Sequence, residues 1–284
     1  MKKLITAAIA LSGAGLLLAA CVAGGGSSMS STGENGISDN PDAWSGYKTA
    51  TAETQAMNDD DFENPVMPYV DLAAGIYNSR DNAGKISCAD CHGAPDDATG
   101  GRSGIPMKGV GANYPRFNAE TGKPINVELQ INKCREERQV EKGFKYEGDE
   151  MIGMTALVRM QSRGMPVVSK AADPANELHA AWTAGKEFYY QRRGQLDMAC
   201  SNCHEDHAGD LIRAETLSQG QSNGFPTYRF KWQKPGTLHR RFAGCNKNIR
   251  AEAFGRGSDE YLNLETYLAW RGRGLPVEAP SVRK

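Results

Sequence analysis

Two short cysteine motifs constrain this chain more than any other feature of its sequence. Residues 88–92 read CADCH and residues 200–204 read CSNCH, so both follow the pattern C-x-x-C-H. In this pattern two thiols add to the vinyl groups of one haem, and the adjacent histidine lies under the ring as the proximal iron ligand. A lone C-x-x-C pair also suits a redox pair or half a zinc site, but two complete motifs predict two covalently bound haem c groups. The predicted attachment residues are Cys88, Cys91, Cys200 and Cys203, and the predicted proximal ligands are His92 and His204.

The N-terminus has the layout of a bacterial export signal, because two lysines precede an apolar run that small residues close. We therefore expect residues 1–20 to be a signal peptide that sends the protein to the periplasm, and residues 21–55 to form a flexible linker. The stretch LAAC at residues 18–21 also resembles a lipobox, in which Cys21 carries a lipid anchor. The alternative is an ordinary cleavage site beside an incidental cysteine. No other segment of the sequence is long and apolar enough to cross a bilayer.

The rest of the chain contains an internal repeat. Residues 148–167 align without a gap to residues 258–277, which lie 110 positions later. Both copies start with Asp-Glu, continue with apolar residues at helical spacing and stop at Gly-x-Pro, which predicts a helix in each. The same offset relates residues 75–77 to residues 185–187, ahead of each C-x-x-C-H motif, and predicts a further helix in each copy.

This repeat predicts a mainly α fold of two tandem cytochrome c-type domains related by duplication. We place the N-terminal domain at residues 56–170 and the C-terminal domain at residues 171–284, with the boundary in the small, polar stretch 169–174. Asp173 is expected to cap the helix that follows. The 32 glycines suit a fold with many loops around a rigid cofactor.

The second axial ligand of the C-terminal haem is not a methionine, because the second unit contains none after Met198. The candidates there are His207, His239, Cys245 and a lysine. His207 follows the proximal histidine by only three residues and is poorly placed to reach over the ring.

The first unit helps to choose among these candidates. It has no histidine after His92, but Cys134 lies 43 residues after Cys91, and Cys245 lies 42 residues after Cys203. Thiolate is an established haem ligand, so matching positions predict His/Cys ligation at both haems, with Cys134 and Cys245 as the ligands. Two alternatives remain. The methionines of the first unit, most of which lie at helix-core spacing, could ligate its haem, or Cys134 and Cys245 could form a disulfide.

At this point the chain resembles SoxA, the dihaem subunit of the SoxAX cytochromes of bacterial thiosulfate oxidation. The resemblance runs from about residues 60–65 to the C-terminus, and its most specific parts are the two motifs, Cys134 and the stretch HRRFAGCN at residues 239–246. It implies an L-cysteine S-thiosulfotransferase that pairs with the monohaem cytochrome SoxX. Such an enzyme joins thiosulfate oxidatively to a cysteine of the carrier SoxYZ and passes two electrons to a c-type cytochrome.

The resemblance also implies which residues act. The C-terminal haem is the catalytic one, Cys245 is its reactive ligand and can carry an extra sulfur as a persulfide, and Arg241 matches the active-site arginine of the family. A guanidinium beside the sulfur would hold and neutralise the thiosulfate dianion. Arg240 and Lys247 could add to this field, although a solvated surface turn is the alternative for the arginines. His239 is expected either beside the site or exposed.

Two other functions remain open. A thiosulfate dehydrogenase, which forms tetrathionate, is also a dihaem cytochrome with a His/Cys haem, but its other haem characteristically has methionine available. A plain dihaem electron-transfer cytochrome is the second alternative, and an arginine beside the thiolate would be unusual equipment for it. The formal net charge of -1 and the absence of a basic block exclude a nucleic-acid partner.

Overall fold

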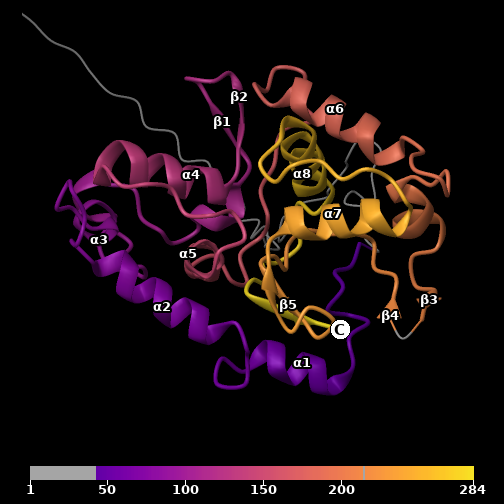
Figure 1. Ribbon diagram of the computed structural model, residues 1–284, viewed down its shortest axis with the longest axis horizontal. Coiled ribbons are helices and arrows are strands. Elements are labelled where there is room, and N and C mark those ends of the chain that lie inside the picture. The colour runs from indigo at the N-terminus through magenta and orange to yellow at the C-terminus, as the bar shows by residue number, and fades with distance from the viewer. Residues whose placement is uncertain (1–42, 214) are drawn as a thin grey trace, which may run out of the picture. The chain divides into compact units, whose positions relative to one another are not determined.

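The computed structural model describes residues 43–213 and 215–284, all within the unit Thr32–Lys284. The predicted signal peptide, the candidate lipid site Cys21 and most of the predicted linker lie outside the described residues. Within the described part, no helix is both long and apolar enough to span a membrane. The first described helix, α1 (Ala52–Asp59), precedes both repeats (Figure 1).

Each repeat is built on a pair of packed helices, as the sequence predicts. In the first, α2 (Met67–Asn78) packs against α5 (Asp149–Met160), and in the second, α6 (His179–Tyr190) packs against α8 (Asp259–Arg271) (Figure 1). Asp-Glu opens both α5 and α8, where the helix dipole favours acidic side chains. At Gly185 of α6, a Cβ atom would come within 2.0 Å of the Asn263 carbonyl oxygen of α8, so only glycine lets these helices cross so closely.

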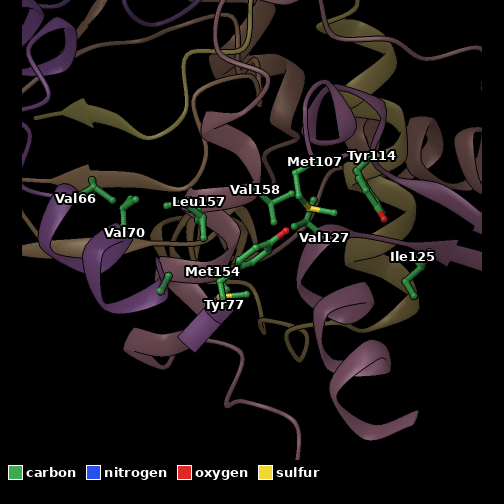
Figure 2. Packing of buried hydrophobic residues seen from close by; sticks show 12 residues of the cluster. Val66, Val70, Tyr77, Met107, Tyr114, Ile125, Val127, Met154, Leu157 and Val158 are labelled. Atoms are coloured by element: carbon green, nitrogen blue, oxygen red, sulfur yellow. The ribbon is translucent and has the colours of Figure 1, made fainter. Parts of the chain in front are cut away.

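The two helix pairs enclose different cores. Figure 2 shows aliphatic side chains, two methionines and Tyr77 in the first, where α2 and α5 face each other. Met107 and Met154 are buried in this cluster, which agrees with a packing role for methionines of the first unit. The second core is largely aromatic, with Tyr189, Tyr261, Tyr267 and Trp270 among its members.

Between the paired helices, each repeat carries its motif helix, a hairpin and a cysteine helix. The first motif forms α3 (Cys88–His92), whereas the second lies on the π-helical turn Asn202–Asp206. The hairpins are β1 (Arg116–Asn118) with β2 (Lys123–Ile125) and β5 (Thr227–Arg229) with β6 (Lys234–Gly236). The cysteine helices are α4 (Val127–Cys134) and α7 (Leu238–Asn248). The other short elements are turns at Gly101–Ser103, Val110–Asn113 and Arg135–Gln139, the hairpin β3 (Leu211–Ile212) with β4 (Glu215–Thr216), and β7 (Ser281–Arg283), which pairs in parallel with β5.

The segment that joins the repeats differs from the prediction in one respect. Asp173 does not cap α6, which begins six residues later at His179 after Leu178. Instead, Asp173 accepts a hydrogen bond from the Ala175 amide (2.9 Å) and Asn176 accepts one from the Leu178 amide (2.9 Å). These side chains hold two successive turns, so the helix starts later. The boundary between residues 170 and 171 stays a prediction.

A buried polar cluster connects the two cysteine helices. Glu128 of α4 and His239 of α7 hold equivalent positions, 111 residues apart, and both face Glu265 of α8. His239 accepts a hydrogen bond at Nδ1 from the Gly257 amide (2.9 Å) and donates from Nε2 to Glu265 (3.0 Å), so its ring is neutral. Burial and the Glu265 carboxylate raise the pKa of Glu128 to about 8, while Arg159 of α5 opposes the shift.

Glu128→Gln is expected to stabilise the protein at alkaline pH. The fold favours the protonated carboxyl, so this contribution is complete below the ordinary carboxyl pKa and is lost as pH rises toward about 8. Glutamine resembles the protonated acid and does not titrate. The gain in unfolding free energy should be on the order of 2 kcal/mol at about pH 9 and near zero at about pH 5. Thermal unfolding at both pH values checks this, with the exposed Glu252→Gln as control. An equal change in Tm at both pH values would contradict the assignment.

Candidate active site

A cavity of about 790 Å³ in the second repeat collects the residues that the sequence singles out. Its wall is mostly apolar and includes Cys200, Cys203 and His204 of the motif together with Arg241 and Cys245 of α7. This volume lies within the roughly 300–1,000 Å³ range of cofactor and ligand sites. The cavity therefore joins the second motif and the second cysteine helix in one site.

His204 is held in one orientation by backbone. Its Nδ1 is hydrogen-bonded to the Ser218 carbonyl oxygen (2.8 Å), which leaves Nε2 as the free ring nitrogen. A Cβ atom at Gly220 would come within 2.8 Å of the His204 ring, so a glycine is required where the chain passes over the imidazole. Fixing the outer ring nitrogen in this way is how proteins orient a histidine that binds a metal through the other nitrogen.

Cys245 faces the same site from α7, which begins after its cap Thr237. Leu238, Arg241, Phe242, Cys245 and Ile249 follow helical spacing, and all five line the cavity. The Cys245 thiol is within hydrogen-bonding reach of the His204 side chain. Burial raises the pKa of the Cys245 thiol, but the opposing effects of Arg241 and His204 are together larger, so this pKa is lowered to about 7. The site thus favours a thiolate opposite the motif histidine.

Other residues that the sequence suggests lie away from the cavity. Arg240 stacks over the Trp232 ring at 4.5 Å and donates to the Pro235 carbonyl oxygen, and Lys247 is exposed on α7. His207 bonds to Asp210 at the surface (2.9 Å), and His239 is fully buried beside Glu265 rather than exposed. Of the candidate ligands compared above for the second haem, Cys245 is the one that lines the cavity with His204.

The structure also brings an unpredicted arginine to the cavity. Arg229 of β5 is almost fully buried, forms an ion pair with Glu215 and donates from Nε to the Lys284 carbonyl oxygen (2.8 Å). It also contributes to the lowered pKa of Cys245. No motif marks this residue, since its partners come from β4 and from the C-terminal end of the chain. The one signal in the sequence is an arginine inside an apolar stretch, GFPTYRF, at residues 224–230.

The first repeat arranges its motif in the same way. His92 Nδ1 is hydrogen-bonded to the Ile105 carbonyl oxygen (2.9 Å), matching His204 and Ser218. Burial and then the neighbouring Cys134 raise the pKa of Cys88 to about 11, which places Cys134 of α4 beside the motif. Cys134 and Cys245 are both free thiols here, so the structure gives no support to a disulfide between them.

Both sets of side chains fit a c-type haem. Each offers two thiols for covalent attachment, a histidine whose free nitrogen is Nε2 and a second sulfur from a cysteine helix. The apolar walls of the second cavity suit the porphyrin faces. The residues that would hold the two groups are those that the motifs predict.

Comparisons with known proteins agree with this arrangement. The family model for the SoxA/TsdA cytochrome c domain matches the chain twice, at residues 73–167 and 184–277. The L-cysteine S-thiosulfotransferase subunit SoxA of Pseudaminobacter salicylatoxidans is 45% identical over 84% of this chain and 80% of its own length, and the same subunit of Rhodovulum sulfidophilum is 44% identical over 84% and 79%. The crystal structure of SoxXA from P. pantotrophus matches with a TM-score of 0.78 and 42% identity, over 85% of this chain and 87% of that chain.

The prediction of two cytochrome c domains is therefore confirmed, and such domains bind haem c covalently. The curated relatives match along most of their length as well as most of this chain. On these grounds the chain belongs to the SoxA family of cytochromes.

Proposed function

We propose that this chain is the SoxA subunit of an L-cysteine S-thiosulfotransferase, which joins thiosulfate to a cysteine of a carrier protein. One observation supports this most strongly: Arg241 and Cys245 lie one turn apart on α7 and line the same cavity as the motif histidine His204. A fixed cation beside a thiolate suits an anionic sulfur substrate better than simple electron transfer. The SoxA names of the relatives point to the same activity.

The reaction is an oxidative conjugation. A carrier thiol and thiosulfate combine to give a protein S-thiosulfonate, with release of one proton and two electrons: R–SH + S–SO₃²⁻ → R–S–S–SO₃⁻ + H⁺ + 2e⁻. One S–S bond forms and one S–H bond breaks. A c-type cytochrome takes the electrons, and the haem supplies the redox centre through which they leave the site.

The residues divide this work between charge and sulfur chemistry. Arg241 binds the thiosulfate oxygens through its planar fork of donors and offsets their charge. Cys245 is both the second axial ligand and the reactive sulfur, able to carry an extra sulfur as a persulfide. Arg229, anchored by Glu215, adds positive field at the inner wall. Arg240 and Lys247 lie off the cavity, so any effect they have on the substrate acts at longer range.

The proposed cofactor content is two haem c groups with His92/Cys134 and His204/Cys245 as axial pairs. Denatured protein should therefore carry two covalent haems by intact mass. Cys203→Ser should lose one of them, whereas Cys134→Ser should keep both, because the Cys134 sulfur is a ligand and not an attachment point. A wild-type protein with a single covalent haem would contradict the dihaem assignment.

The proposed partners are a SoxX-like monohaem cytochrome, a SoxYZ-like carrier, thiosulfate and a c-type cytochrome as electron acceptor. The matching solved structure is one of SoxXA, which supports the heterodimer. The proposed location is the periplasm, with residues 1–20 as the export signal. A lipid on Cys21 stays a prediction, and the mass of the mature N-terminal peptide would test it.

Product analysis tests the proposed function. The holoprotein with its monohaem partner, the carrier, thiosulfate and oxidised cytochrome c should add a thiosulfonate to the carrier cysteine, with two cytochromes reduced per carrier modified. A thiosulfate dehydrogenase would release tetrathionate whether or not the carrier is present, and a plain electron carrier would form neither product. Either result would overturn the proposal.

A further inference from the structure

The two cysteine helices can be compared residue by residue, since the chain contains both copies. Helix α4 has Asn126 as its cap and ends on Cys134, and α7 has Thr237 as its cap and carries Cys245, each pair 111 residues apart. One turn before the cysteine, the same alignment places Gln130 opposite Arg241. The first site therefore has a neutral amide where the second has a cation.

Gln130 is in direct contact with its cysteine. Its Nε2 donates a hydrogen bond to the Cys134 Sγ at 3.3 Å, and the residue is partly buried. Side chains four residues apart on a helix lie on one face, so this contact follows from the local structure alone. An N–H donor on a thiolate ligand withdraws charge from the sulfur and stabilises the reduced state of a metal site.

A second position in the repeat shows the same exchange. The strands β1 and β5 are equivalent, since both follow a cis X-Pro bond and pair with β2 and β6 in the same register. Arg229 of β5 then corresponds to Asn118 of β1, which serves a local turn by accepting from the Glu120 amide (3.0 Å). Both arginines that act on Cys245 thus have amides as their counterparts near Cys134.

The cations nearest to Cys134 along the chain have other partners. Arg135 stacks over the Phe144 ring at 3.7 Å and donates to the Lys142 carbonyl oxygen. Arg116 lies over the Tyr114 ring at 6.0 Å. Gln130 is therefore the donor that the structure gives to the Cys134 sulfur.

We propose that Gln130 is a positioning residue of the first haem site, where its neutral N–H···S hydrogen bond sets the reduction potential and its lack of charge withholds the anion-binding cation that Arg241 provides in the second. The inference rests on the proposed ligation by Cys134. It gives the duplicated halves different work through one side chain, electron transfer at Cys134 and sulfur chemistry at Cys245.

A graded series at position 130 tests this in the full dihaem protein. Gln130→Leu removes the donor, Gln130→Glu replaces it with a negative acceptor of the same shape, and Gln130→Arg keeps a donor and adds positive charge. The potential of the first haem, followed by EPR-monitored redox titration, should fall in the first two variants and rise in the third. A tenfold change in the reduction equilibrium, about 59 mV for one electron, is expected at each step.

Two matched controls separate this role from general packing. Gln139 donates weakly to the Cys88 sulfur (3.8 Å), which is a proposed attachment atom and not an iron ligand, so Gln139→Leu should not reproduce the shift. Arg241→Gln should move only the signal of the second haem.

Equal potentials for wild type, Gln130→Glu and Gln130→Arg would overturn the inference, even if Gln130→Leu perturbs folding. A first haem that shows no thiolate signal in the wild type would instead overturn the proposed ligation by Cys134, so the two failures are distinguishable.

Discussion

Replacement of Cys245 by methionine is expected to abolish thiosulfate conjugation while the C-terminal haem stays low-spin. Methionine can ligate iron through its thioether, and α7 carries the side chain to the position opposite His204. A thioether has no ionisable proton, so it can neither act as a thiolate nucleophile nor carry a persulfide. Conjugation to the carrier cysteine, measured by mass, should fall to background, and the visible spectrum should keep its six-coordinate form.

Conjugation at the wild-type rate by Cys245→Met would limit this cysteine to ligation. The reactive group would then have to lie elsewhere, with the partner interface as the next place to search. Loss of the haem itself from this variant would show that the sulfur is needed for assembly of the site.

Replacement of Arg241 by alanine is expected to lower conjugation by about tenfold to a hundredfold while the His/Cys spectrum persists. One charge-assisted contact to a partly desolvated anion contributes roughly 1.5–3 kcal/mol, which corresponds to that range of rates. Arg241→Lys should restore part of the activity, because a point charge lacks the bidentate fork. Steady-state rates at several thiosulfate concentrations check the loss.

Arg240→Ala is the matched control for Arg241→Ala. It removes the same charge from the neighbouring position, but Arg240 stacks on Trp232 outside the cavity, so its loss should have a much smaller effect. Equal losses in the two variants would mean that α7 contributes a diffuse positive field, and Arg241 would have no contact of its own with the substrate.

Much of the framework was predictable because it depends on local sequence. The helices α5 and α8 appear in the sequence as repeated Asp-Glu starts with apolar spacing, and the motifs fix the attachment cysteines and proximal histidines. The equal distances from Cys91 to Cys134 and from Cys203 to Cys245 predict that the lone cysteines hold matching places. The cysteine helices α4 and α7 bear this correspondence out.

The remainder depends on contacts between distant segments, which no local pattern records. The hairpins β1–β2 and β5–β6 have strands of three residues with a proline in β2 and in β6, too short to show alternation. The orientation of His204 depends on the backbone carbonyl of Ser218, which any residue could supply. Arg229 acts at the site only because β4 and the last residue neutralise and hold its side chain.

His239 shows the same limit within the most recognisable stretch of the sequence. Its place beside Arg240 and Arg241 suggests a position at or near the active site, yet its partners are Glu265 and the Gly257 amide, on the side of α7 away from the cavity. Helical phase separates it from Cys245, which lies six residues on and close to the opposite face.

Low-temperature EPR of the oxidised protein tests the ligation on which both the proposed function and the role of Gln130 depend. Thiolate ligation by Cys134 and Cys245 predicts two low-spin ferric signals, both with the g-values of a histidine/thiolate haem. A high-spin signal, or a histidine/methionine signal in place of either one, would contradict it.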